Sequence, residues 1–231
     1  MILREGIFYA SLLDDRPVVH GFTTRRWGNL GFGKNPGDPD VIANRKALWE
    51  KLGLSNRIHI QPRQIHSDLF IHESEFVPGA AADGVYGSSP QNIFSVLTAD
   101  CVPILLYHPD GIVGTLHAGW RGLYNDIIPK ALTKLPSQTS AVLGPAIGSC
   151  CYEVGKDLAA DFQQKFGEPV VVHSAGKPRL DLIQVAILQL LESGVEEMEA
   201  AHLCTACHPD LFFSYRRDGS SGRMMSFIGL I

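Results

Sequence analysis

A cysteine and two histidines stand at the ends of β-prone segments and could together bind one metal ion. Cys101 opens an apolar run at 102–107, and His117 closes the next run at 112–117 after a Pro-Asp-Gly turn. If these two runs pair as an antiparallel hairpin, Cys101 and His117 lie together at its open end. His66 stands just before another β-prone run and could complete a set of three.

Two imidazoles and one thiolate suit zinc, and three protein ligands with a fourth position open are typical of catalytic zinc sites. Without a metal, Cys101 and His117 could instead form a nucleophile and its base, because an imidazole can hold a thiol as the thiolate. A cysteine between apolar runs is also often a small buried side chain with no chemical role. The residue types alone leave these interpretations open.

Helix signals that could position these residues occur at four places. Asp40 caps a predicted helix that runs to Leu52, and Asp181 caps a predicted helix over 182–193. Leu158, Phe162 and Phe166 recur at helical spacing before Gly167, and a further helix follows Asn125 with Pro129 in its first turn or at a kink.

Short β-prone runs lie between these helices, at 18–22, 58–61, 69–72, 93–98, 102–107, 112–117 and 140–143. The three runs between 93 and 117 predict a meander or hairpin set in a core sheet. Helices and strands do not alternate regularly, which favours a mixed α/β layout over a doubly wound sheet.

Composition and charge narrow the class of protein. The chain has 231 residues, 45% of them hydrophobic and 19% charged, which predicts one globular domain over 1–231. Twenty Lys and Arg against 24 Asp and Glu give a net charge of −4, which argues against a general nucleic-acid binder. The most apolar stretch, 102–106 with its flanks, is too short to cross a membrane. No signal-peptide pattern opens the sequence, so we expect a cytoplasmic protein with reduced or metal-bound cysteines.

Nine segments resemble, in order, the motifs of one known family. They are 21–25, 44–45, 64–66, 98–103, 117–122, 144–148, 152–155, 204–205 and 213–217. Together they closely resemble the YfiH-type family, which is labelled polyphenol oxidase or laccase-domain protein and was later assigned purine nucleoside phosphorylase activity. The Ala-Asp-Cys-x-Pro and His-Ala-Gly-Trp-Arg-Gly motifs are highly specific, and the resemblance spans nearly the whole chain. One departure is the segment 24–29, which replaces a usual Gly-Gly turn and leaves the pocket near Arg25 less well defined.

The resemblance implies a single-domain α/β sandwich of four layers, α/β/β/α, akin to certain toxin cysteine hydrolases. It implies a metal site at His66, Cys101 and His117, holding zinc, with copper as the alternative ion. The implied reaction is phosphorolysis of adenosine, inosine, guanosine and methylthioadenosine, with adenosine deamination on the same site. The expected partners are purine nucleosides and phosphate, with no nucleic acid and no membrane. A homodimer is possible, although no residue pattern specifies one.

Phosphorolysis needs an anion site beside the glycosidic bond, and arginine presents a planar fork that matches phosphate oxygens. The arginines in motif segments are Arg25, Arg45, Arg121, Arg216 and Arg217, with Arg25 first by its setting. The backbone N–H groups of 119–122 would add to such a site if a helix begins there. Gln64 and Glu153 are further candidate substrate contacts, and Asp100 or Glu153 could move protons, although both could equally be structural caps.

Three other functions compete with this interpretation. Peptidoglycan editing, to which bacterial family members are linked, would use Cys101 and His117 as a cysteine hydrolase. A copper-dependent polyphenol oxidase would need His-x-His pairs, which the sequence lacks. A metal-binding interaction module would have a closed metal site and no turnover.

A second cysteine cluster in the sequence, Cys204-Thr205-Ala206-Cys207-His208, matches the pattern of c-type haem attachment, which requires export. No signal peptide is present, and the family resemblance covers Cys204-Thr205 without haem, which argues against haem. Cys204, Cys207 and His208 could still bind an adventitious metal ion. The adjacent Cys150 and Cys151 favour packing beside the 144–148 loop over a redox pair.

Overall fold

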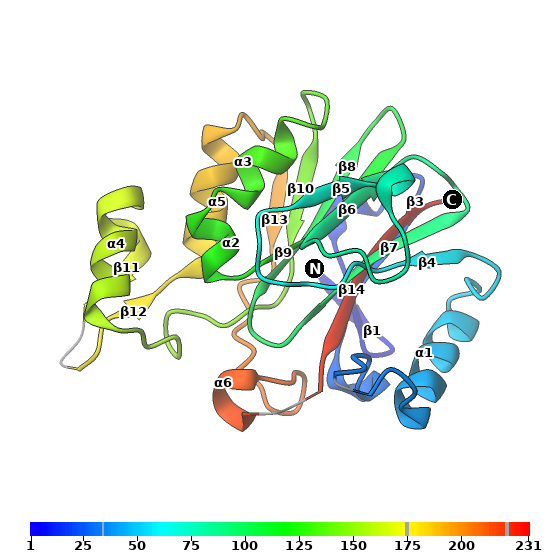
Figure 1. Cartoon of the computed structure of the whole chain (residues 1–231), viewed down its shortest axis with the longest axis horizontal. Helices are drawn as coiled ribbons and strands as arrows, with labels where there is room; N and C mark the ends of the chain where they lie inside the picture. The colour runs from blue at the N-terminus through cyan, green and yellow to red at the C-terminus, as the bar shows by residue number, and fades with distance from the viewer. Residues whose placement is uncertain (34, 174–175, 220–221) are drawn as a thin grey trace.

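Two six-stranded sheets lie face to face in the computed structural model, which describes residues 1–33, 35–173, 176–219 and 222–231 (Figure 1). The first sheet consists, in spatial order, of β1 (Ile2–Arg4), β2 (Ile7–Tyr9), β3 (Val18–Thr23), β14 (Met224–Leu230), β7 (Asn92–Thr98) and β4 (Ile58–Ile60). The second consists of β13 (Met198–Ala200), β10 (Ser140–Leu143), β8 (Val102–His108), β9 (Ile112–Ala118), β6 (Gly84–Gly87) and β5 (Phe70–His72). Neighbours pair antiparallel except β4 with β7, β5 with β6 and β10 with β13.

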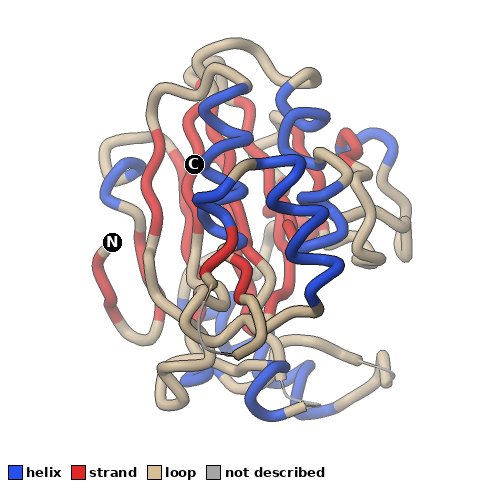
Figure 2. Tube along the Cα trace, turned by 90° about the vertical axis from the view of Figure 1, so that its left-hand side faces the viewer, coloured by secondary structure: helices blue, strands red, loops and turns tan. Residues whose placement is uncertain are grey.

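Helices cover the outer face of each sheet. The helices beside the second sheet are α2 (Trp120–Tyr124), α3 (Ile127–Leu132), α4 (Lys156–Phe166) and α5 (Leu182–Glu192), and Figure 2 shows helices in front of the strands. A two-stranded sheet of β11 (Val171–Val172) and β12 (Arg179–Leu180) lies beside α4. On the other side of the sandwich, α1 (Pro39–Lys51) covers the first sheet. The short α6 (Tyr215–Asp218) lies among the loops. The result is the four-layer α/β/β/α sandwich that the sequence resemblance implied. No helix in the described ranges combines the length and apolar character needed to cross a membrane.

Three apolar layers hold this sandwich together. Phe22, Phe94 and Leu105 pack between the two sheets, whereas Leu48 and Phe227 belong to the layer beneath α1. The third layer lies between the second sheet and its helices. A central strand is buried on both faces, so it consists of a nearly continuous apolar run, as in β8.

The predicted hairpin of β8 and β9 is confirmed. Val102 pairs with Ala118 and Pro103 with His117, and the two strands meet through a turn in which Gly111 has φ +76°. The predicted meander over 93–117 is wrong, because β7 pairs with β14 and β4 in the other sheet. The connection at 99–101 crosses between the sheets, with Asp100 at φ +106°.

The predicted helices are all present, and one cap differs from the prediction. Asp38 and not Asp40 caps α1, because Pro39 takes the first helical position and the Asp38 carboxylate accepts from the backbone N–H groups of Asp40 and Val41. Asp181 caps α5 by accepting from the Gln184 N–H, as predicted. The predicted strands are also present, most of them within one residue of their predicted ends.

Candidate metal centre

His66, Cys101 and His117 converge where the β8–β9 hairpin meets the loop before β5. Each offers one ligand atom, and the three atoms all lie within 4.8 Å of one another. Cys101 Sγ is 4.0 Å from His66 Nε2, and the two imidazole rings are almost perpendicular with their centroids 4.9 Å apart. The hairpin places Cys101 and His117 together, and the loop at 61–68 supplies His66.

Asp83, which the sequence analysis did not single out, holds two of these residues in place. Its side chain is fully buried, and one oxygen accepts from His117 Nδ1 at 2.8 Å. The same carboxylate accepts from the consecutive backbone N–H groups of Ile65, His66 and Ser67. His66 has φ +59° in this turn. Asp83 therefore fixes the His66 loop and leaves His117 Nε2 free to bind a metal.

The charges within the trio and on Asp83 stabilise one another. Burial alone would raise the pKa of Cys101, but the positive charge of His117 and hydrogen bonds from both imidazoles lower the pKa well below that of an ordinary thiol. Burial would likewise lower the pKa of His117, whereas Cys101 and Asp83 raise it above its usual range. Burial opposes ionisation of Asp83, yet the bonds from His117 and Ser67 hold its pKa below the usual value. The site thus favours a thiolate at neutral pH.

The donor set fits a catalytic zinc or copper ion. Two imidazole nitrogens and a thiolate converge, and Asp83 occupies the far nitrogen of His117. Within the part of the chain that the structure describes, no fourth His, Cys, Asp or Glu joins this group. His66 is exposed, Cys101 half-buried and His117 buried, so the site is open to solvent from the His66 side. This openness distinguishes the trio from a structural site with four protein ligands.

Gly119 forms part of the wall of the trio. A Cβ at this position would lie 3.0 Å from Cys101 Sγ and 3.2 Å from His66 Cδ2. The backbone of Gly119 has φ −80°, so alanine causes no backbone strain there. Glycine is needed at 119 because of the space that the metal ligands occupy.

We expect Gly119→Ala to weaken metal binding about tenfold or more while the fold is retained, because the added methyl group displaces Cys101 Sγ and His66. The measurement is zinc affinity by competition with a chromogenic chelator. Gly155→Ala is the matched control, because nothing lies within 4 Å of a Cβ at that position. Equal zinc affinity in the two variants would show that the trio tolerates a methyl group and is not tightly packed.

Asp100 connects the metal centre to the C-terminal loops. Its carboxylate accepts from Thr205 Oγ1 at 2.6 Å and from the Arg216 backbone N–H at 2.7 Å, and its carbonyl accepts from Ile147 N–H. With both oxygens engaged and the side chain buried, Asp100 is placed as an anchor next to Cys101. Thr205 is a second residue that the sequence analysis missed in this role.

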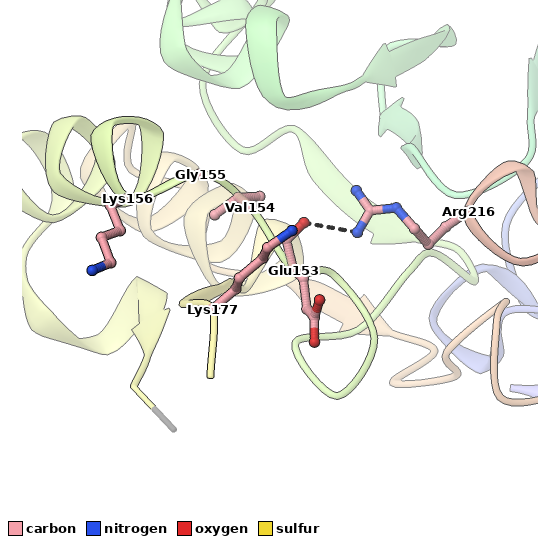
Figure 3. A pocket seen from close by; sticks show the side chains of 6 residues that line it. All are labelled: Glu153, Val154, Gly155, Lys156, Lys177 and Arg216. Carbon is pink, nitrogen blue, oxygen red and sulfur yellow. Dashed lines mark hydrogen bonds between the residues drawn. The ribbon is translucent and has the colours of Figure 1, made fainter. Parts of the chain in front are cut away.

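A basic hollow of about 530 Å³ lies beside this anchor (Figure 3). Its lining includes Lys156, Lys177, Arg216 and Glu153, and Arg216 Nη1 donates to the Glu153 carbonyl at 2.7 Å. The Arg216 guanidinium stacks on Tyr152, 4.7 Å from the ring centroid. The Glu153 carboxylate is exposed.

Tyr152 interacts both with Arg216 of the hollow and with the surroundings of Cys101. Burial raises the pKa of its phenol to about 12, and the Cys101 sulfur adds to this effect, while Arg216 and Arg121 oppose it. The phenol is therefore within electrostatic range of Cys101 and of both guanidinium groups. Arg121 itself is exposed, stacks on Trp120 at 4.7 Å, and has no hydrogen-bond or ion-pair partner among the described residues.

The other candidate substrate residues are held by contacts with the protein. Arg25 donates to the Pro209 carbonyl and stacks on Phe213. Arg45 is half-buried, and donates to the Leu30 carbonyl and to the side chain of Gln61, and its desolvation lowers its pKa to about 10.

Gln64 and Arg217 also make contacts that hold neighbouring loops. Gln64 exchanges two hydrogen bonds with the backbone of Leu97, which fixes the loop that carries His66 against the end of β7. Arg217 donates to the carbonyls of Thr205 and Phe212 and pairs with Asp218. Arg216 and Glu153 thus line the hollow, and Arg121 is among the charges that act on Tyr152. Arg45, Gln64 and Arg217 instead hold neighbouring loops through hydrogen bonds to the backbone.

Comparisons with known proteins agree on one family. Residues 19–231 match the family described as multi-copper polyphenol oxidoreductase laccase. An Escherichia coli K12 protein named purine nucleoside phosphorylase YfiH is 33% identical, over 92% of this chain and 91% of the relative. A Bacillus subtilis protein named purine nucleoside phosphorylase YlmD is also 33% identical, over 94% of this chain and 90% of the relative.

Solved structures show the same fold over the whole length. The crystal structure of YlmD from Geobacillus stearothermophilus has a TM-score of 0.88 at 30% identity, and the match covers 100% of this chain and 98% of that one. A crystal structure from Neisseria meningitidis has a TM-score of 0.88 at 31% identity, covering 98% and 99%. Because the family model spans most of the chain and both named relatives exceed 30% identity, the chain belongs to this laccase-domain family, together with the YfiH and YlmD proteins.

Proposed function

We propose that this protein is a zinc-dependent purine nucleoside phosphorylase acting on adenosine, inosine, guanosine and methylthioadenosine, with adenosine deaminase activity on the same site. The observation that carries the proposal is the open trio of His66, Cys101 and His117. Asp100, next to Cys101, links it to Arg216 in the wall of a basic hollow. Relatives named purine nucleoside phosphorylase, aligned over nine-tenths of their length, support the same reaction.

His66, Cys101 and His117 would hold the ion, and Asp83 keeps His117 in the tautomer that leaves Nε2 free. When bound, such an ion supplies a positive charge that polarises an oxygen atom of a substrate or of water. The protein's own contribution is to fix these ligands rigidly and to leave one side open. Asp100 acts as a positioning residue for Cys101 and for the Arg216 segment.

In this proposal, phosphate is bound by cationic side chains in and near the hollow. Arg216 and Arg121 have N–H groups that no described residue fully uses, and Lys156 and Lys177 add positive charge. We rank Arg216 above Arg25 because Arg216 lines the hollow and Arg25 does not. Each guanidinium stacks on one ring and donates to one carbonyl, so these contacts do not separate the two. A phosphate oxygen would form the new bond to ribose C1′ as the glycosidic bond breaks, and the departing purine would take up a proton from solvent. Glu153 is the candidate side chain to relay that proton from solvent, because its carboxylate is exposed in the lining of the hollow.

The test is incubation of the pure, zinc-loaded protein with each of the four nucleosides, with and without phosphate, and identification of products by mass. Phosphorolysis gives free purine and a pentose 1-phosphate only when phosphate is present, whereas deamination converts adenosine to inosine without phosphate. Absence of both product sets for all four nucleosides would refute the proposal.

Arg216→Ala should raise the KM for phosphate about 10–100-fold, because it removes a charge-assisted contact worth about 1.5–3 kcal/mol. Arg25→Ala is the matched control and should change this KM less than threefold or so. Adenosine deamination should change little in either variant, because water replaces phosphate as the incoming group. If Arg25→Ala gives the larger increase, phosphate binds on the Arg25 side instead.

One alternative function has an observation in its favour. The lowered pKa of Cys101 beside His117 also suits the nucleophile of a cysteine hydrolase in peptidoglycan editing. A copper polyphenol oxidase of the multicopper type needs a histidine-rich cluster, and among the described residues His66 and His117 are the only histidines in a ligand group. A non-catalytic metal-binding module would not need the open fourth side of the trio.

A further inference from the structure

Four cysteine sulfurs that the proposed reaction does not use converge at one point on the surface. The ligand atoms of Cys150, Cys151, Cys204 and Cys207 all lie within 4.8 Å of one another. Cys207 Sγ is 3.4 Å from the sulfur of Cys150 and also 3.4 Å from that of Cys151. His208 is exposed and lies outside this group, so the sequence-based set of Cys204, Cys207 and His208 was wrong in its third member.

Two loops bring these sulfurs together from distant parts of the chain. Cys150 and Cys151 lie in a single turn, closed by bonds from the Cys151 and Tyr152 N–H groups to the Gly148 carbonyl. Cys204 lies on a segment that pairs in parallel with Ala146, and Thr205 N–H donates to the Ala146 carbonyl. The backbone geometry of both loops therefore aims all four side chains into one volume.

A backbone donor points at one sulfur of the cluster. The Gly148 N–H donates to Cys204 Sγ at 3.3 Å. Bonds of this N–H···S kind orient and stabilise the sulfur ligands of metal sites. Gly148 itself is required to be small, because a Cβ there would lie 3.2 Å from Cys150 Sγ and 3.3 Å from Cys204 Cβ.

A disulfide is the competing explanation for such closeness. A disulfide joins two sulfurs at a distance of about 2 Å. Here the Cys207 sulfur lies at the same distance from the sulfurs of Cys150 and Cys151, and the Cys204 sulfur belongs to the same group. Four sulfurs around a zinc ion, each about 2.3 Å from the metal, are separated by roughly 3.8 Å, which matches the spacing here better than a single bonded pair.

We propose that Cys150, Cys151, Cys204 and Cys207 bind a second divalent ion, of the zinc type, in a closed tetrathiolate site. The Cys-x-x-Cys spacing of Cys204 and Cys207 is typical of such sites. Four protein ligands leave no position for substrate, so this ion is structural and distinct from the open trio. Binding it releases the protons of the cysteine thiols, and nearby Arg179 and Arg217 offset the negative charge of the resulting centre.

The ion would join the two loops that support the metal centre. Thr205, next to Cys204, donates to the anchor Asp100, and Arg217 donates to the carbonyls of Thr205 and Ala206. On the other loop, Arg179 donates to the Cys150 carbonyl and Arg216 to the Glu153 carbonyl. The cysteine cluster therefore supports the loop that carries Glu153, but none of the four cysteines lines the basic hollow.

The test measures metal content per chain by elemental mass spectrometry, on protein purified without oxygen and loaded with zinc or cobalt. We expect about two ions in the unmodified protein and about one in both Cys101→Ser and Cys207→Ser. The cobalt form of Cys101→Ser should keep the strong sulfur-to-cobalt charge-transfer absorption of four thiolates, which Cys207→Ser should lose. Cys150→Ser provides an independent exposed position if Cys207→Ser folds poorly.

The Cys101→Ser chain decides the question without a variant in the cluster. If it binds no metal, or its thiol titration shows a disulfide among the remaining four cysteines, the proposal is overturned. An inactive protein whose Cys101→Ser variant still binds one ion would contradict the proposed phosphorylase activity and leave the second site standing. The two proposals thus fail in different measurements.

Discussion

Cys101→Ser should lower the rate of phosphorolysis about a thousandfold or more, because the ion at the trio supplies several kcal/mol of transition-state stabilisation. Cys101 offers the one thiolate in the ligand group, 4.0 Å from His66 Nε2. Chelation of the unmodified protein should abolish turnover, and added zinc should restore it. The measurement is the initial rate of purine release under saturating phosphate.

Alkylation with iodoacetamide distinguishes a metal ligand from a nucleophile at Cys101. In the metal-loaded protein the sulfur is engaged and should react slowly, and after chelation it should react quickly. If Cys101 were instead the nucleophile of a hydrolase with His117 as its base, an acyl adduct would accumulate on Cys101 and activity would survive complete removal of metal. That pair of results would refute the metal-dependent mechanism.

The pH dependence of this alkylation follows from the charges around Cys101. His117 lowers the pKa of the thiol, so the metal-free protein should hold a reactive thiolate at pH values well below the ordinary thiol pKa. The rate should fall only when the pH drops through this lowered value. His117→Ala should move the profile back toward higher pH, because the positive charge is then absent.

The metal trio could be predicted from the sequence because Cys101 and His117 lie at the ends of two strands that pair locally. Cys101 and His117 belong to one hairpin, and the turn and apolar runs of that hairpin are visible in the sequence. Asp83 was missed because it reaches His117 across a pairing of β6 with β9, 34 residues apart. No residue pattern near position 83 predicts the hydrogen bond between Asp83 and His117.

The same reason explains the cysteine cluster. Cys150 and Cys207 are 57 residues apart, and the loops that carry them are brought together by tertiary contacts such as the pairing of Ala146 with Cys204. From sequence, Cys150 and Cys151 therefore look like a packing pair, and Cys204 and Cys207 look like a separate cluster. Patterns within a segment predict its local structure, whereas sites shared between loops depend on topology.

The strands, too, differ in how far their own residues predict them. Runs rich in Val, Ile and Leu, such as β8, were predicted to within one residue. The strands that were not predicted include β6, with the sequence Gly-Val-Tyr-Gly, and β14, which contains Met, Ser and Gly. Such residues favour strands weakly, and these segments are extended because each is paired on both sides within its sheet.

Asp83→Asn should destabilise the fold by about 3 kcal/mol or more and lower zinc affinity about 10–100-fold. The buried carboxylate accepts from three backbone N–H groups, from Ser67 Oγ and from His117. An amide of the same shape turns an N–H group toward one of these donors, which leaves a buried donor unsatisfied. For a chain of this length the thermal midpoint should fall by roughly 10 °C.

Asp68→Asn is the matched control, because Asp68 pairs with the exposed Lys130 at the surface of the same loop. It should cost no more than about 1 kcal/mol and leave zinc affinity unchanged. The two effects of Asp83→Asn also separate its two roles: the loss of stability arises from the loop at 65–67, and the loss of zinc affinity from the orientation of His117. If Asp83→Asn bound zinc as tightly as Asp68→Asn, the His117 ring would be held by its packing and backbone alone, and Asp83 would support only the fold.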